Sequence, residues 1–123
     1  ALEPTSSAAH GCLGLTLKRK GDLDGAIASY QQAISIDPKA ADVHSNLGLA
    51  LKSKGDLNGA IASYQRAISL VPNHAEAHCN MGIALYQKGD LDGAIASWKQ
   101  ALSLDPEHVE ARTNLGIALR MKR

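Results

Sequence analysis

Phenylalanine is absent from this chain of 123 residues, and aromatic residues as a whole make up only 3% of it. Hydrophobic residues nevertheless account for 45%, which is enough to bury a core and excludes a disordered tail. With so few large rings, the core must be built from leucine, isoleucine and alanine. This composition favours closely packed helices.

An excess of either charge is also missing, because 13 basic and 12 acidic residues leave a net charge of +1. A dedicated nucleic-acid-binding protein has a strong basic excess, so no nucleic-acid partner is expected. No apolar run approaches the ~18 residues of a membrane span. The opening residues, ALEPTSSAAH, lack the basic and then apolar pattern of a signal peptide. We therefore expect no membrane association and an intracellular, cytoplasmic location, unless the chain is a piece excised from a longer protein.

What the chain does contain is a block of sequence that occurs three times. GDLDGAIASYQQAISIDP begins at Gly21, GDLNGAIASYQRAISLVP at Gly55 and GDLDGAIASWKQALSLDP at Gly89. Both steps are 34 residues (55 − 21 and 89 − 55). A unit of this size cannot bury its apolar face alone and must stack on its neighbours. The period therefore predicts an elongated array with a long surface.

The boundaries of the units follow from counting in steps of 34 from Ser7. Repeat units are expected over 7–40, 41–74 and 75–108, with an N-terminal extension over 1–6 and a capping helix or truncated fourth unit over 109–123.

Each unit carries two helical patterns, which are clearest in the second. The first helix is expected over 41–54, where Gly55 ends it as a left-handed cap. Asp56 then caps a second helix over 58–70, which Pro72 cannot continue. An apolar stripe at a spacing of three and four marks the buried side of this second helix. Its members are Ala60, Ile61, Tyr64, Ala67 and Ile68.

Glycines recur inside these helices, where each costs about 1 kcal/mol relative to alanine. Gly14, Gly48, Gly82 and Gly116 stand at one position of successive units. We expect close helix approach there, with Tyr30, Tyr64 or Trp98 lying over the bare backbone. A second set, Gly25, Gly59 and Gly93, stands where a glutamate would complete a capping box, and the sequence offers no firm reason for it.

These fixed positions resemble the signature of the tetratricopeptide repeat (TPR). In the second unit they are Leu47, Gly48, Leu51, Gly55, Ala60, Tyr64, Ala67 and Pro72. The resemblance covers residues 7–123 and implies an all-α, right-handed α–α superhelix of three helix pairs plus a seventh helix at the C-terminal end. It also implies that first helices line the concave face. One departure is the fourth residue of each unit, often tryptophan in the family, which is His10, His44, His78 or Arg112 here and suggests looser outer packing.

The resemblance implies a non-catalytic protein–protein interaction module that binds an extended peptide in its concave groove. On a helical wheel, one side of each first helix faces this groove. The asparagines of that side recur at intervals of 34 and can pair with a peptide backbone through their amides. This column is similar to the asparagine ladder of O-linked N-acetylglucosamine transferases, although Cys12 breaks it in the first unit. The predicted peptide-binding residues are Asn46, Asn80, Asn114, Asp42, Glu76, Leu49, Ile83, Lys52 and Tyr86.

Three alternatives to this interpretation are open. The asparagines can serve as caps or touch a neighbouring helix, as in ordinary repeats of the family. The chain can also be a structural unit that self-associates end to end through Leu115 and Leu119, or the non-catalytic part of a larger glycosyltransferase. The carboxylate clamp with which some relatives bind chaperone C-termini is disfavoured, because the positions that need lysine hold Gly11, Leu15 and Glu76.

Motifs for other chemistry are lacking. There is no G-x-G-x-x-G, P-loop or G-x-S-x-G pattern, so neither catalysis nor a cofactor is expected. His74 and His78 have the spacing of two metal ligands on one helical face, but His74 falls where one unit meets the next, which favours a structural role over a metal site. Cys12 and Cys79 lie two repeat steps apart, too far for a disulfide, and free thiols fit a reducing compartment.

Overall fold

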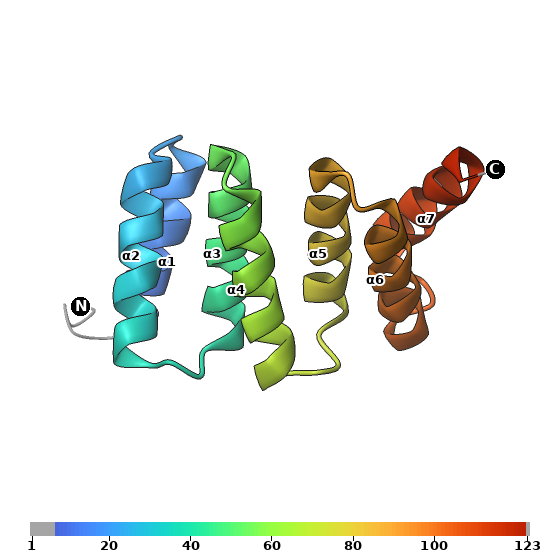
Figure 1. The fold of residues 1–123 in the computed structure, drawn as a ribbon. Helices are drawn as coiled ribbons and strands as arrows, with labels where there is room; N and C mark the ends of the chain where they lie inside the picture. The colour runs from blue at the N-terminus through green and yellow to red at the C-terminus, as the bar shows by residue number, and fades with distance from the viewer. Residues whose placement is uncertain (1–6, 123) are drawn as a thin grey trace.

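The computed structural model describes residues 7–122, which form seven α-helices and no strand (Figure 1). The helices are α1 (Ser7–Arg19), α2 (Leu23–Ile36), α3 (Ala41–Lys54), α4 (Leu57–Leu70), α5 (Ala75–Lys88), α6 (Leu91–Leu104) and α7 (Val109–Met121). The expected all-α architecture of three helix pairs and a seventh helix is confirmed. The extension expected over 1–6 lies outside the described residues.

Local signals in the sequence set the helix ends. Gly55 has φ +97°, the left-handed cap expected after α3, and Gly21 and Gly89 adopt the same conformation. One residue later, the Asp56 carboxylate accepts a hydrogen bond of 2.9 Å from the Gly59 N–H and so caps α4. The tight turn and the cap together fold α3 back against α4.

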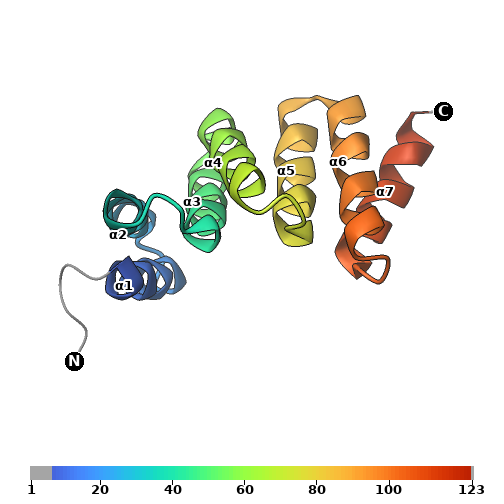
Figure 2. The same cartoon turned by 90° about the horizontal axis from the view of Figure 1, so that it is seen from below.

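The hairpins pack side by side into a curved array (Figures 1 and 2). Each helix packs most closely on its partner within the hairpin and then on the next helix along the chain. Among the odd-numbered helices, α1 also contacts α3, and α3 contacts α5. Within residues 7–122, the even-numbered helices α2, α4 and α6 do not pack on one another to the same extent. The odd-numbered helices therefore form the inner side of the curve.

The core combines alanines with one aromatic ring per unit. Tyr30 and Tyr64 are fully buried and Trp98 is 3% exposed. Each ring lies over a glycine of the preceding helix, as expected. A Cβ added at Gly48 would lie 2.6 Å from the Tyr64 ring, and a Cβ at Gly82 would lie 2.6 Å from the Trp98 indole. Only a residue without a side chain fits beneath these rings.

The second set of glycines, which the sequence left unexplained, has a steric reason at the caps. A Cβ at Gly59 would lie 2.4 Å from the carboxylate of Asp56, and Gly25 and Gly93 stand in the same relation to Asp22 and Asp90. The glycine therefore leaves room for the capping carboxylate to rest over the N–H that it accepts. Glycine therefore stands at the capping-box position in place of glutamate, and it allows the aspartate to approach the backbone more closely.

The histidines at the fourth position of the second and third units are not loosely packed, contrary to expectation. His44 and His78 are 7% and 9% exposed. Their Nε2 atoms lie 3.0 Å from the Pro38 carbonyl oxygen and 3.2 Å from that of Pro72. Where the family often has a large tryptophan side chain, these units have a smaller histidine ring that hydrogen-bonds the turn between units.

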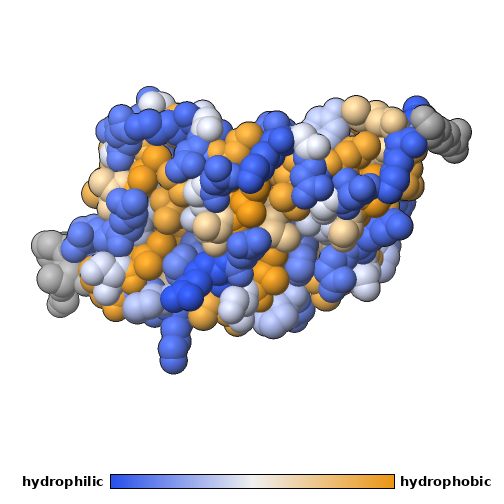
Figure 3. Space-filling view, in the orientation of Figure 1, coloured by the Kyte–Doolittle hydropathy of each residue, from blue (hydrophilic) through white to orange (hydrophobic). Residues whose placement is uncertain are grey.

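The outer face of the array is mixed in character. Figure 3 shows hydrophilic and hydrophobic side chains interspersed over the face seen in Figure 1, on which α2 and α4 lie in front. No helix in residues 7–122 combines the length and the apolar character that a membrane crossing requires.

Candidate peptide-binding groove

Two hollows lie on the inner side of the curve. The first, which we call the α5–α7 pocket, has a volume of about 420 Å³ and is bounded by α5, α7 and the Trp98 side chain of α6. The second, which we call the α1–α3 hollow, has a volume of about 790 Å³. Both open between successive odd-numbered helices, so we use "the groove" for the surface of α1, α3, α5 and α7 that contains them.

The structure brings five of the nine predicted peptide-binding residues to these hollows. Ile83, Tyr86 and Asn114 line the α5–α7 pocket. Asp42 and Asn46 line the α1–α3 hollow, together with Cys12, which occupies the asparagine position of the first unit. Sequence reasoning missed Trp98 and Glu110 as pocket residues. Glu110 belongs to the same column as Asp42 and Glu76, and this spacing was the signal that could have identified it.

The other four predicted residues lie outside both hollows. Leu49 is half-buried and packs against the cluster around Tyr64, so part of its surface serves the core. Lys52 is half-buried and Glu76 is exposed. Asn80 is only 4% exposed, and its amide nitrogen is buried without a hydrogen-bond partner. The three asparagines therefore differ in access to solvent, with Asn46 and Asn114 open to the hollows and Asn80 enclosed between them.

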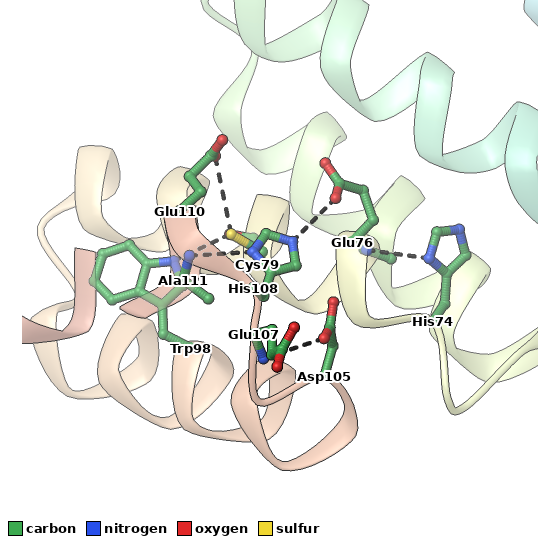
Figure 4. A network of polar contacts seen from close by, with 10 residues as sticks. His74, Glu76, Cys79, Trp98, Asp105, Glu107, His108, Glu110 and Ala111 are labelled. Carbon is green, nitrogen blue, oxygen red and sulfur yellow. Dashed lines mark hydrogen bonds and ion pairs between the residues drawn. The ribbon is translucent and has the colours of Figure 1, made fainter. Parts of the chain in front are cut away.

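Two histidines link successive odd-numbered helices at the edge of the groove, and Figure 4 shows the link between His108 and Glu76. The Nδ1 atom of His108 accepts a hydrogen bond of 3.2 Å from the Ala111 N–H, which caps α7. Its Nε2 atom must then carry the proton, and it donates to the Glu76 carboxylate at 3.0 Å. His74 caps α5 in the same way and lies 3.5 Å from Asp42. These histidines act as caps and interhelical links, in line with the structural role expected for His74.

The remaining member of the acidic column, Glu110, faces a buried thiol. The Cys79 Sγ atom is 3.9 Å from Glu110 Oε1, and Figure 4 shows Glu76 beyond the neighbouring His108 ring. Burial, followed by the two nearby carboxylates, raises the pKa of Cys79 to about 12. The thiol is therefore neutral at physiological pH and is not a nucleophile. The backbone oxygen of Cys79 accepts a hydrogen bond of 3.1 Å from Trp98 Nε1, which fixes the indole at the base of the pocket.

The two cysteines are both free, as expected, and we predict very different reactivity for them. Cys12 is exposed, whereas Cys79 is fully buried with a raised pKa. A thiol reagent at pH 8 should modify Cys12 within minutes and Cys79 only when the array unfolds. Counting modified thiols with time by mass spectrometry tests this, with Cys12→Ser as the control that isolates Cys79. Rapid labelling of Cys12→Ser in the absence of denaturant would contradict the packing of α5 against α6 and α7.

No three side chains of the types that ligate metals converge anywhere in the described residues. The polar groups of the groove are instead amides, carboxylates and capping histidines, which can donate and accept hydrogen bonds. This chemistry suits recognition of a polar backbone.

Comparison with known proteins places this architecture in a family. A family model described as TPR repeat matches residues 14–55, 48–89 and 84–122. No curated protein matches the sequence significantly. Among solved structures, MamA is 28% identical, with a TM-score of 0.92 over 98% of this chain and 70% of that one.

Two further similar structures share the fold at lower identity. The first TPR domain of Spaghetti (RPAP3), bound to the HSP90 peptide SRMEEVD, is 20% identical, with a TM-score of 0.92 over 98% of this chain and 95% of that one. The TPR domain of Arabidopsis OM64 is 18% identical, with a TM-score of 0.92 over 94% and 96% of the two chains. The chain therefore belongs to the tetratricopeptide repeat family of protein-interaction modules and has its right-handed α–α superhelical fold.

Proposed function

We propose that the chain binds an extended segment of a protein partner in the groove. The observation that carries this proposal is that the α5–α7 pocket and the α1–α3 hollow each lie between odd-numbered helices and are each lined by an asparagine of the predicted column, Asn114 in the first and Asn46 in the second. An asparagine amide can pair with a peptide N–H and C=O at once, whatever the peptide side chain is. Extended peptides commonly gain affinity from such main-chain hydrogen bonds.

Asn80, between the two hollows, supports the same role. Its amide nitrogen lacks a partner, and a buried donor left unpaired costs on the order of 1–3 kcal/mol. A small rotation of this side chain toward a peptide carbonyl in the groove would provide the missing acceptor and relieve that cost. The central asparagine thus gains more from an occupied groove than the two that already reach solvent.

The charges of the groove favour a partner other than an acidic C-terminus. Asp42, Glu76 and Glu110 follow one edge and would repel such a peptide, and Gly11 and Leu15 take the place of clamp lysines. The similar domain that binds SRMEEVD is only 20% identical, so it supports the fold and not a shared ligand. Lys52 and Tyr86, at the other edge, are proposed to tune selectivity, and Leu49 and Ile83 to supply apolar contact.

The test combines Asn46→Ala with Asn80→Ala. We expect the pair to weaken a peptide selected on the unmodified chain several-fold or more, because two main-chain contacts are lost. Fluorescence anisotropy with the labelled peptide measures the affinity, and circular dichroism checks that the helices persist. The matched control combines Asn58→Ala with Asn73→Ala, two exposed asparagines, one at the start of α4 and one in the turn after it. Equal affinity for both double variants would remove the asparagines from the binding site.

Self-association is the second candidate, and the surface of α7 favours it. The side chains of Leu119 and Met121 on α7 are 43% and 53% exposed. A second copy docking on these side chains would extend the superhelix and leave the groove available. In either case the proposed role is non-catalytic.

A further inference from the structure

The walls of the α5–α7 pocket are largely apolar. Ile83 and Ile117 face it from the two helices, and Trp98, itself 3% exposed, lies at its base. The indole N–H is already engaged by the Cys79 carbonyl, so the ring offers carbon surface to the pocket. Tyr86 is 40% exposed, with its ring centroid 6.2 Å from that of Trp98 and the planes at 40°. The pocket therefore suits an extended aliphatic group.

One charged residue, Glu110, lines this pocket. Two other acids of the same column lie beside histidines: Glu76 accepts a hydrogen bond from His108, and Asp42 lies 3.5 Å from His74. Glu110 has no cationic partner within residues 7–122 and is approached only by the Cys79 thiol, a weak donor, at 3.9 Å. A carboxylate has about four acceptor sites, so Glu110 retains most of its capacity for a positively charged donor.

We infer that the α5–α7 pocket takes an arginine or lysine side chain of the peptide, with its aliphatic stem against Ile83, Ile117 and Tyr86 and its positive charge at Glu110. Basic side chains cover apolar surface with their stems while the charged end stays hydrated. The face of an exposed tyrosine ring also attracts a cation. This inference rests on the proposed groove function and adds to it the chemical class of residue that is recognised.

The equivalent positions on α3 and α5 carry a positive charge that disfavours the same ligand. At the position of Tyr86 in the preceding unit, 34 residues earlier, the chain has Lys52. Lys52 belongs to α3, and its ammonium opposes the rise in the pKa of Cys79. A basic peptide residue would be repelled there. Tyr86 in place of lysine thus directs the basic residue to the α5–α7 pocket.

The test uses residues 1–123 and a phage library of nine-residue peptides that are random at every position. The library is selected in parallel on the unmodified chain, on Glu110→Gln and on Glu107→Gln, which removes the same charge from the exposed turn before α7. We expect arginine or lysine to be enriched at one position on the unmodified chain and on Glu107→Gln. Enrichment on Glu110→Gln should be about fivefold lower, the factor that corresponds to one partly exposed ion pair.

Synthetic peptides then locate the contact. The selected peptide and its counterpart with norleucine, an uncharged aliphatic side chain, are titrated while the indole N–H signal of Trp98, the only tryptophan, is followed by NMR. On the unmodified chain, we expect the norleucine peptide to bind about fivefold more weakly than the selected peptide. On Glu110→Gln, we expect the two peptides to bind with equal affinity.

Failure of this inference is distinguishable from failure of the groove proposal. Equal binding of the arginine and norleucine peptides, or a consensus without a basic residue, overturns the inference. If the selected peptides still lose affinity for the variant that combines Asn46→Ala with Asn80→Ala, the groove proposal stands without the inference about a basic residue. A library that yields no binding peptide contradicts both.

Discussion

Replacing Tyr64 by alanine is expected to lower the free energy of unfolding by about 3–5 kcal/mol, the usual cost of removing a fully buried aromatic side chain. Tyr64 is 0% exposed and packs with Ala60 and Ala84 in the middle of the array, with Leu49 and Met81 beside them. Its neighbours come from three consecutive helices, so the cavity left by alanine lies across the junction of two units. Because the free energy of unfolding of a native domain is only about 5–15 kcal/mol, this one substitution removes a large part of it.

Tyr64→Phe is the matched control, with an expected effect near zero or stabilising by up to about 1 kcal/mol. The Tyr64 hydroxyl is buried without a hydrogen-bond partner, so phenylalanine removes an uncompensated polar atom and keeps the ring. Urea titration followed by circular dichroism measures both variants. A large loss of stability in Tyr64→Phe would contradict the packing described here, since it would show that the hydroxyl has a partner.

The pH dependence of unfolding separates Tyr64→Phe from the unmodified chain. Burial raises the pKa of Tyr64 above its ordinary value of 10, and the Glu76 carboxylate adds to the shift. Because the folded-state pKa is the higher one, this contribution to stability is complete below pH 10 and is lost as the pH rises further. Tyr64→Phe should therefore lose less stability than the unmodified chain between pH 10 and 11.

The second large effect is a difference in sign between two glycine-to-alanine substitutions at equivalent positions. Gly48→Ala should lower the free energy of unfolding by about 1–3 kcal/mol, because its Cβ would lie 2.6 Å from the Tyr64 ring and must displace it. Gly116→Ala should raise it by up to about 1 kcal/mol, because no heavy atom lies within 4 Å of the new Cβ and alanine is the better helix former.

The same urea titrations compare the two glycine variants. A third protein, Gly48→Ala combined with Tyr64→Leu, tests the stated cause, since removing the ring should make the alanine tolerable. Its loss of stability should be smaller than the sum of the two single losses. If Gly48→Ala stabilised the array as Gly116→Ala does, the ring would not lie on the backbone of α3.

Much of the fold could be predicted because its signals are local and recur three times. Gly55 and Asp56 specify a helix end and the next helix start within two residues, and Pro72 prevents continuation. Each of these effects depends on backbone conformation within one turn. The pairing of Gly48 with Tyr64 could also be predicted, because a costly glycine that recurs at a fixed distance from a large ring indicates that the ring packs on bare backbone.

The candidate site was predicted less completely, because access depends on neighbouring helices. A helical wheel places Asn46, Asn80 and Asn114 on one side, but it cannot show that Asn80 is enclosed whereas Asn46 and Asn114 remain open. It also cannot show that Asp42 and Glu76 lie beside His74 and His108, which precede the following odd-numbered helices. These contacts span 32 residues, and each depends on the packing angle between two hairpins.

The sequence alone therefore determined the array: the period, the helix ends, the rings over glycine and the side of each first helix that faces inward. Those properties arise within one unit or between identical neighbours, so the repeat itself encodes them. Only the tertiary structure decided which positions of that inner side remain free, because the units are not identical at their contacts. Glu76 accepts a hydrogen bond from His108, whereas Glu110 is approached within the described residues only by the Cys79 thiol. Tyr86, which lines the apolar pocket between α5 and α7, stands where the preceding unit has Lys52.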